Sequence, residues 1–366
     1  MKRSKIGLAL SLLLAVGTLL GACGKANNNA GNNATGGKKG FTVGMVTDIG
    51  GIDDKSFNQS AWKGLQDFGT ANHLSQGKNG YDYLQSQSDA DYATNLNTLS
   101  RQGFDLIYGI GYLMQNDVDT VAKQQPKSHF AIIDAEVKEP NVASVLFREN
   151  ESSFLAGVVA GMTTKTNKIG FIGGMESDVI QRFESGFVAG VKAANPNATV
   201  DIQYAASFSD AAKGQAIASR MYSSGDDVVF AAAGATGNGL FKEARDRKAK
   251  NPNQAIWVIG VDQDQSAEGI VTAGGKQVNV VITSAMKRVD NAVKDLTTKT
   301  KNGSFPGGKT SIYGLAENGV GLSTINPALP NKAAVEKAVS DWTSKIKSGT
   351  VKVPATRAEL KTFSVK

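Results

Sequence analysis

Short apolar runs alternate with amphipathic stretches along most of this chain, and no other feature restricts its fold as strongly. The apolar runs are expected to form strands at Phe41–Val46, Tyr81–Leu84, Leu106–Tyr108, Phe130–Ile133, Ala143–Phe147, Ile169–Ile172, Val200–Tyr204, Val228–Ala231, Ile256–Gly260 and Val278–Thr283. The amphipathic stretches are expected to form helices at Phe57–Ala71, Asp91–Arg101, Gln115–Gln124, Phe154–Thr163, Val179–Ala194, Ala211–Ser223, Gly239–Arg247 and Met286–Lys299. Because strand–helix–strand order requires crossover connections, it builds parallel sheets with helices on both faces. The chain is therefore predicted to be an α/β protein.

This number of strands favours two sheets over one very wide sheet. The chain is expected to cross between them near Asn150, Ser284 and Ala316, with two more short strands at Ser311–Leu315 and Gly319–Leu322. The predicted fold is therefore two doubly wound parallel-sheet lobes joined by a three-strand hinge, as in type I periplasmic binding proteins. A ligand would bind where the carboxyl ends of both sets of strands face each other.

The expected lobes are discontinuous in the sequence. Residues 41–149 with 285–316 would form the N-terminal lobe, and residues 150–284 with 317–366 the C-terminal lobe. A further helix is expected at Asn331–Lys347, followed by a loosely packed tail from Gly349 to Lys366.

The N-terminus reads as a secretory signal. Basic residues are followed by an uncharged apolar run from Ile6 to Ala22, which is too short for a comfortable transmembrane helix. Leu20–Cys23 matches the bacterial lipobox, whose cysteine carries a diacylglycerol, so residues 1–22 are predicted to be a lipoprotein signal peptide and Cys23 the lipidation site. The alternative is a plain signal peptide with an incidental cysteine. As Cys23 is the only cysteine of the chain, disulfides and thiolate metal sites are excluded.

Residues 23–40 would form a lipidated cysteine and a flexible tether, because their Lys, Asn, Gly, Ala and Thr cannot bury enough apolar surface to order. The expected location is the extracytoplasmic face of the cell membrane, reached through the lipid anchor. The formal net charge of +7 includes three basic residues of the signal. The remaining excess is scattered, which does not indicate nucleic-acid binding.

The segment from Asp48 to Asn58 is the most informative candidate for a site. A buried strand ends at Asp48, a glycine pair makes a loop, Ser56 can cap, and a helix opens at Phe57. Free N–H groups of that helix would face the cleft, beside a carboxylate, an aromatic ring and an amide. Alternatively, Asp48 and Ser56 are loop and cap residues and Phe57 is buried in the core; spacing alone supports either interpretation.

The sequence gives little support to catalysis. His73 and His129 have no recognisable nucleophile or carboxylate partner, and the G-x-S-x-G elbow is missing. Gly234–Gly239 follows a strand and opens a helix, but it lacks both the G-x-G-x-x-G order and a following Gly-Lys-Ser/Thr. No His/Asp cluster indicates a metal. We therefore expect a binding protein without a cofactor and not an enzyme.

Several segments together resemble the basic membrane protein family, lipoproteins that include the purine nucleoside receptors and serve as substrate-binding components of ABC importers. The segments that carry the resemblance are Val43–Trp62, Ile110–Met114, Phe130–Asp134, Glu151–Gly157, Ile169–Gly174, Phe183–Phe187, Ala233–Gly239, Gly260–Gln265 and Thr283–Arg288. Their combination covers nearly all of the chain beyond the tether and is far more specific than any one of them.

The resemblance implies a purine nucleoside site. Phe57, with Phe183 as one candidate for a second aromatic wall, would flank the purine ring; Phe208 and Phe230 are the other candidates, although Phe230 is expected to point into a buried strand. The residues implied to meet polar atoms of the base are Asp48, Asn58 and Asp134. Those implied to hold the ribose are Asp262 and Lys287, because a diol can donate to a carboxylate and accept from an ammonium.

Each assignment has a plainer alternative. Asp134 could cap the turn after its strand, Lys287 could be a surface lysine, and Gly237 could let the backbone approach a ligand or only make a tight turn. The resemblance further implies ABC permease and ATPase partners and capture by hinge closure. We expect the protein to be a monomer. Two other functions stay open: binding of another small ligand such as a sugar or furanose, and a surface sensor or adhesin on the same fold.

Overall fold

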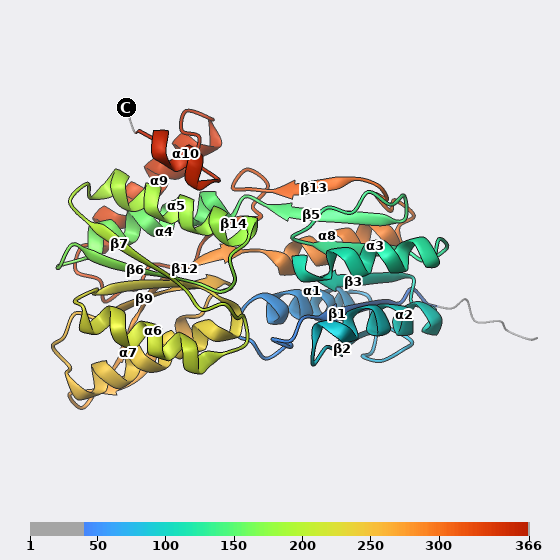
Figure 1. The fold of residues 1–366 in the computed structure, drawn as a ribbon, viewed down its shortest axis with the longest axis horizontal. Coiled ribbons are helices and arrows are strands. Elements are labelled where there is room, and N and C mark those ends of the chain that lie inside the picture. Colours follow the sequence, from blue (N-terminus) through green and yellow to red (C-terminus); the bar gives the residue numbers. More distant parts are fainter. Residues whose placement is uncertain (1–39, 365–366) are drawn as a thin grey trace, which may run out of the picture. The chain divides into compact units, whose positions relative to one another are not determined.

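The computed structural model describes residues 40–364, which belong to a compact unit that begins at Gly40. The predicted signal peptide, Cys23 and most of the tether lie outside the described residues. Among the helices described, none is long and apolar enough to cross a membrane. Two six-stranded sheets organise the unit, one in each lobe (Figure 1).

The N-terminal lobe contains a sheet in the order β13-β5-β4-β3-β1-β2, in which all neighbours are parallel. Its strands are β1 (Val43–Thr47), β2 (Tyr81–Gln85), β3 (Leu106–Ile110), β4 (Phe130–Ile133), β5 (Val142–Phe147) and β13 (Thr310–Tyr313). Helices α1 (Phe57–Ala71) and α8 (Val289–Lys301) cover one face, and α2 (Tyr92–Gln102) and α3 (Gln115–Gln124) cover the other. The sheet is therefore buried on both sides, which explains its continuous apolar strands.

The C-terminal lobe repeats this plan in the order β14-β12-β9-β8-β6-β7. Its strands are β6 (Lys168–Gly173), β7 (Thr199–Tyr204), β8 (Val228–Ala232), β9 (Trp257–Asp262), β12 (Val281–Lys287) and β14 (Val320–Leu322). Helices α4 (Glu149–Thr163) and α5 (Asp178–Ala194) pack on one face, and α6 (Ala211–Ser223) and α7 (Asn238–Lys250) on the other. All neighbours are parallel except the short edge pair β12–β14. The two lobes with parallel sheets confirm the predicted fold class.

Three chain segments connect the lobes, and hydrogen bonds tie them together. The first passes from β5 into α4 at Arg148, whose N–H donates to Tyr313 O at 3.0 Å. The second passes from β12 into α8 at Arg288, whose N–H donates to Gly319 O at 2.8 Å. The third is the stretch between β13 and β14, residues 314–319. Because β12 runs to Lys287, residues 285–287 belong to the second sheet and not to the N-terminal lobe in which they were expected.

A small hairpin before β12 was missed by the sequence interpretation. Strands β10 (Ile270–Ala273) and β11 (Lys276–Asn279) pair antiparallel around Gly274 and Gly275, whose φ angles are +58° and +75°. Two central residues with positive φ are typical of a tight hairpin turn, and glycine adopts this conformation without steric strain. The expected strand at residues 278–283 therefore begins at Val281, and the following helix begins at Val289 and not at Met286.

The C-terminal tail is packed, so the expectation of a loose tail was wrong. After α9 (Lys332–Lys347), the chain forms α10 (Arg357–Thr362), and the Arg357 guanidinium donates from Nε and Nη2 to the two Glu184 oxygens, each at 2.7 Å. The Phe363 ring meets the Phe154 ring edge-on at 6.1 Å. A few long-range contacts hold this segment, and its local composition does not reveal them.

Glycines allow α4 and α5 to pack at close range. A Cβ atom added at Gly190 would lie 1.9 Å from Phe154 O, and one at Gly157 would lie 2.2 Å from Phe187 O. Real Cβ atoms do not approach a carbonyl oxygen so closely, so any larger residue would push the two helices apart.

Gly190→Ala is expected to lower the free energy of unfolding by about 1–3 kcal/mol, because the added methyl group overpacks the α4–α5 contact. The measurement is the midpoint of thermal unfolding, which should fall by several degrees. Gly321→Ala is the control, since no atom lies within 4 Å of an added Cβ there. Equal midpoints for the two variants would contradict the close helix contact.

Candidate functional site

A cavity lies between the lobes, at the carboxyl ends of strands from both sheets. It encloses about 580 Å³ of atom-free space, including space open to solvent. The predicted site residues that line it are Asp48, Phe57, Asn58, Asp134, Phe183, Asp262 and Lys287. Gly237 is not among the lining residues; Gly234, from the same segment and with a φ of +55°, reaches the cavity instead.

The charged residues of the cavity come from strand ends. Asp48 follows β1, Asp134 follows β4, and Asp262 and Lys287 are the last residues of β9 and β12. Asp134 and Asp262 both have left-handed backbones, with φ angles of +71° and +65°. Such φ values are uncommon for residues other than glycine and cluster at functional sites, where the surrounding structure holds them. Parallel topology thus gathers carboxylates from both lobes at one place.

Aromatic rings form the apolar walls. Phe57 lines the cavity from the N-terminal lobe, and Phe183 and Phe208 line it from the C-terminal lobe. Tyr112 also lines the cavity, and its ring meets Phe208 edge-on at 6.2 Å across the lobes. Phe230 is fully buried in the second core, as its strand position indicated, so the second wall facing Phe57 is Phe183 or Phe208.

Asp54, which the sequence interpretation overlooked, organises the start of α1. Its carboxylate accepts from the N–H groups of Ser56, Asn58 and Gln59 at 2.8–3.1 Å. The expectation that free helix N–H groups face the cleft was therefore wrong for Asn58 and Gln59, because Asp54 accepts from both. The Ser56 hydroxyl does not cap the helix; it donates to Asp262 Oδ2 in the other lobe.

Asn58 is held in one orientation by two carboxylates. Its Nδ2 donates to Asp48 Oδ1 at 2.8 Å and to Asp54 Oδ2 at 3.0 Å, which fixes Oδ1 as the free acceptor. Asn58 Oδ1 and Asp134 Oδ1 are buried and have no hydrogen-bond partner among the described residues. Buried acceptors without partners are costly, so a ligand with matching donors would relieve that cost.

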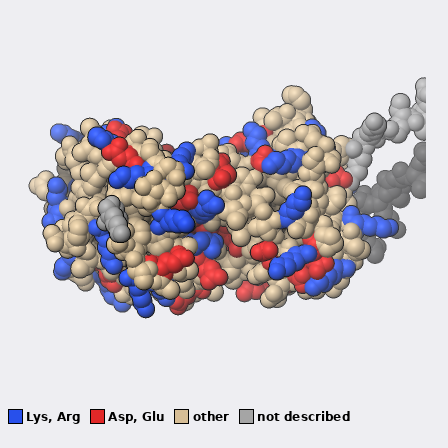
Figure 2. All heavy atoms as spheres, turned by 90° about the horizontal axis from the view of Figure 1, so that it is seen from above, with Lys and Arg blue, Asp and Glu red and all other residues tan. Residues whose placement is uncertain are grey.

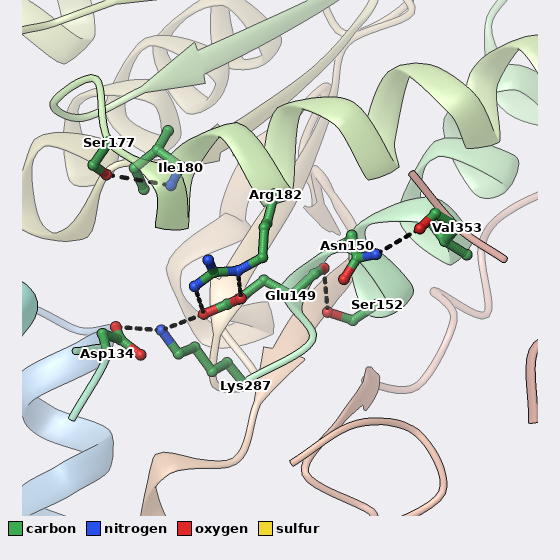
Figure 3. Close-up of polar contacts among 9 residues, drawn as sticks. All are labelled: Asp134, Glu149, Asn150, Ser152, Ser177, Ile180, Arg182, Lys287 and Val353. Carbon is green, nitrogen blue, oxygen red and sulfur yellow. Dashed lines mark hydrogen bonds and ion pairs between the residues drawn. The ribbon is translucent and has the colours of Figure 1, made fainter. Parts of the chain in front are cut away.

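Lys287 is the buried cation of the site, with 1% of its surface exposed. Its Nζ lies 2.5 Å from Asp134 Oδ2 and 3.2 Å from Glu149 Oε1 (Figure 3). It also lies 4.9 Å from the centre of the Phe57 ring and 5.1 Å from that of Phe147. Burial lowers the pKa of Lys287, but the surrounding carboxylates of Asp134, Glu149 and Asp262 raise it above its ordinary value overall, so the amine is charged at neutral pH.

Burial raises the pKa of all four aspartates that line the cavity, Asp54 and Asp134 included. Burial raises the pKa of Asp48 to about 6, against the hydrogen bonds from Gly50 and Asn58. Burial also raises the pKa of Asp262 to about 7, while Lys287 and the Ser56 hydroxyl oppose the shift. Both carboxyls therefore titrate near neutral pH, where loss of the proton creates strong acceptors for ligand donors.

Direct hydrogen bonds join the lobes beside the cavity. Gln263 Nε2 donates to Gln59 Oε1 at 2.5 Å, and Gln265 Nε2 donates to Lys55 O at 2.7 Å. Asn238 Nδ2 donates to Asp54 O at 3.1 Å. The loop before α1 and the first turn of α1 thus contact the C-terminal lobe at several points.

The side chains that line the cavity suit the binding of a small molecule. Neither His73 nor His129 lines it, and within residues 40–364 no group of three His, Cys, Asp or Glu side chains is placed to hold a metal ion. Its walls combine flat rings with fixed acceptors and one ammonium. This combination suits a planar, polar molecule with several donors.

Comparisons with known proteins agree with this geometry. Residues 41–357 match the Bmp family model, described as ABC transporter substrate-binding protein PnrA-like. The chain is 55% identical over 356 residues to the CD4+ T-cell-stimulating antigen of Listeria monocytogenes, covering 97% of this chain and 99% of that relative. It is 47% identical over 358 residues to the ABC transporter nucleoside-binding protein BmpA of Lactococcus lactis, covering 97% and 100%. A solved structure of an ABC transporter solute-binding protein from Aeropyrum pernix K1 is similar with a TM-score of 0.74 at 27% identity, covering 88% of this chain and 96% of that one.

Two parallel-sheet lobes with a ligand cavity between them define a solute-binding protein of the kind that works with ABC permeases and ATPases. This chain belongs to the Bmp family of PnrA-like ABC transporter substrate-binding proteins, which confirms the resemblance seen in its sequence. The family is one of binding proteins and not of enzymes.

Asp262→Asn is expected to stabilise the ligand-free protein at pH 7.5 by roughly 1–3 kcal/mol and to have less effect at pH 5. As the folded-state pKa of Asp262 is about 7, the folded protein binds more protons than the unfolded chain between its ordinary pKa and 7. Stability therefore falls as pH rises through that window, and an amide removes the effect while still accepting from Ser56.

Urea unfolding at both pH values measures this difference. Asp264→Asn is the control, since Asp264 is an exposed neighbour on the same loop. Equal stabilisation by Asp262→Asn at pH 5 and pH 7.5 would show that the carboxyl is not perturbed by burial.

Proposed function

We propose that this protein captures purine nucleosides, such as inosine, guanosine and adenosine, outside the cytoplasmic membrane and delivers them to an ABC permease. The observation that carries the proposal is the placement of Asp262 and Lys287 in one cavity with the Phe57 ring, where Lys287 Nζ lies 4.9 Å from the ring centre. A nucleoside presents a flat base joined to a diol, and the cavity offers a ring beside a carboxylate and an ammonium. The relative BmpA, 47% identical to this chain, is named a nucleoside-binding protein.

Each part of a nucleoside would meet a suited group. The base would lie against Phe57, with Phe183 or Phe208 on its other face, because offset stacking favours flat aromatic rings. Its donors would meet Asp48, Asp134 and the free Oδ1 of Asn58. The ribose hydroxyls would donate to Asp262 and accept from Lys287.

The contacts come from both lobes, which supports capture by closure of the hinge. Phe57 and Asn58 belong to the N-terminal lobe, whereas Asp262 and Lys287 belong to the C-terminal lobe. A ligand that engages both sets binds the closed state better than the open state, and this difference shifts the population toward closure. The closed form is then what the permease would recognise.

The charges of the cavity favour a neutral ligand. Among the described residues that line it are four aspartates, Asp48, Asp54, Asp134 and Asp262, and one lysine, Lys287. A 5′-phosphate would bring two negative charges to a place where carboxylates already outnumber cations, and burial would amplify the repulsion. Nucleosides should therefore bind and nucleoside phosphates should not.

The location follows from the N-terminal residues and the family. Lipidation of Cys23 would anchor the protein at the extracytoplasmic face, with the tether spacing it from the bilayer. Its partners would be the permease and ATPase of the importer, and it would act as a monomer.

The alternative role, as a surface sensor or adhesin, would require a surface that binds macromolecules. The face seen in Figure 2 carries interspersed basic and acidic side chains, which does not single out such a surface.

Calorimetric titration with inosine tests the proposal, with guanosine, adenosine, ribose and inosine 5′-monophosphate as comparisons. Inosine at a hundred times its dissociation constant should also add about 2.7 kcal/mol to the stability. Asp262→Ala should weaken inosine binding about ten- to a hundredfold, because a charge-assisted hydrogen bond is lost, while Asp264→Ala should leave it unchanged.

Three results would contradict the proposal or part of it. Stabilisation by ribose but by none of the nucleosides would indicate a sugar receptor. Equal binding of inosine and its 5′-monophosphate would contradict the selection for a neutral ligand, and unchanged affinity in Asp262→Ala would remove this residue from the site.

A further inference from the structure

Four charged side chains of alternating sign form a buried chain through the hinge (Figure 3). Arg182 Nε donates to Glu149 Oε2 at 2.5 Å, Lys287 Nζ lies 3.2 Å from Glu149 Oε1, and the same ammonium lies 2.5 Å from Asp134 Oδ2. Asp134 and Lys287 line the cavity, whereas Glu149 and Arg182 do not. The ion pairs connect this outer pair to the ligand site through Lys287.

The chain joins elements that differ in their relation to the hinge. Glu149 opens α4 directly after the first crossing, and Lys287 ends β12 directly before the second. Arg182 comes from α5 inside the C-terminal lobe, and Asp134 from the end of β4 in the N-terminal lobe. The contact between Lys287 and Asp134 thus bridges the lobes, whereas the contact between Glu149 and Arg182 joins two helices of the C-terminal lobe.

Glu149 competes with Asp134 for the ammonium. The Glu149 side chain is fully buried, and a buried carboxylate with few partners draws strongly on any cation within reach. Lysine can respond, because its ammonium sits on a flexible four-carbon stem. Arg182 supplies Glu149 with a second cation, and Lys287 lies closer to Asp134 than to Glu149. Burial raises the pKa of Glu149, but Lys287 and Arg182 together hold it below its usual value, so its charge persists at neutral pH.

We infer that Arg182 is a positioning residue for ligand binding: by holding Glu149, it leaves the Lys287 ammonium directed to Asp134 and the cavity. Without Arg182, the charge of Glu149 draws Lys287 back toward the hinge, away from the ligand and from the N-terminal lobe. The inference rests on the proposed function, because inosine is its probe.

Arg182→Gln should weaken inosine binding about tenfold in calorimetric titration at pH 7.5, although Arg182 does not line the cavity. Arg182→Lys should recover much of the loss, since it restores a cation beside Glu149. The matched control is Arg247→Gln on α7 of the same lobe, whose side chain is 22% exposed against 21% for Arg182 and also pairs with a glutamate, Glu243. That variant should bind inosine as the unmodified protein does.

Removal of the Glu149 charge separates positioning from a structural role. The double variant Glu149→Gln with Arg182→Gln should bind inosine more tightly than Arg182→Gln alone, because nothing then draws Lys287 away from Asp134.

Two results would overturn the inference. One is unchanged inosine affinity in Arg182→Gln. The other is a loss that Glu149→Gln does not relieve, because this would show that Arg182 only supports the fold. Titration of the unmodified protein with inosine tests the proposed function separately. If the unmodified protein does not bind inosine, the proposed function fails; if it binds inosine but the Arg182 variants do not behave as expected, only the inference fails.

Discussion

The ion pair between Lys287 and Asp134 is the contact on which the site depends. It joins the last residue of β12, at the hinge, to the end of β4 in the opposite lobe, at 2.5 Å and almost without exposure to solvent. A buried ammonium requires carboxylates around it, and these same carboxylates give the cavity its acceptors. The rings of Phe57 and Phe147 complete the enclosure of the ammonium. The proposed ligand contacts and the contact between the lobes therefore use the same side chains.

Several features of the cavity reduce the stability of the ligand-free protein. Asp134 and Asp262 have left-handed backbones, Asn58 Oδ1 and Asp134 Oδ1 have no partner among the described residues, and burial raises the pKa of Asp48 and Asp262. The unpaired acceptors and the raised pKa values share one cause, which is the burial of polar groups without enough hydrogen-bond partners. A ligand that supplies donors would remove much of that cost, and this gain would contribute to the affinity.

The sequence predicted the two-sheet architecture well because local patterns of apolar and polar residues determine where strands and helices alternate. It also placed Asp48 and Asp134 correctly at strand ends, from which parallel topology brings side chains to a common edge. Their binding roles stay a prediction. Other features depend on contacts between distant segments: Glu149 and Arg182 lie on two helices that no local pattern connects, and Arg357 docks the tail on Glu184. The Asp54 cap and the Gly274–Gly275 turn did have local signals, an acidic residue before a helix and a glycine pair, which the interpretation overlooked.

A crystal structure of the protein grown with inosine tests the central claim most directly. The account predicts electron density for the nucleoside between the lobes, with the base against Phe57 and the ribose hydroxyls within about 3 Å of the Asp262 carboxylate and the Lys287 ammonium. Inosine bound elsewhere, or an unoccupied cavity with these side chains turned away from it, would contradict the account.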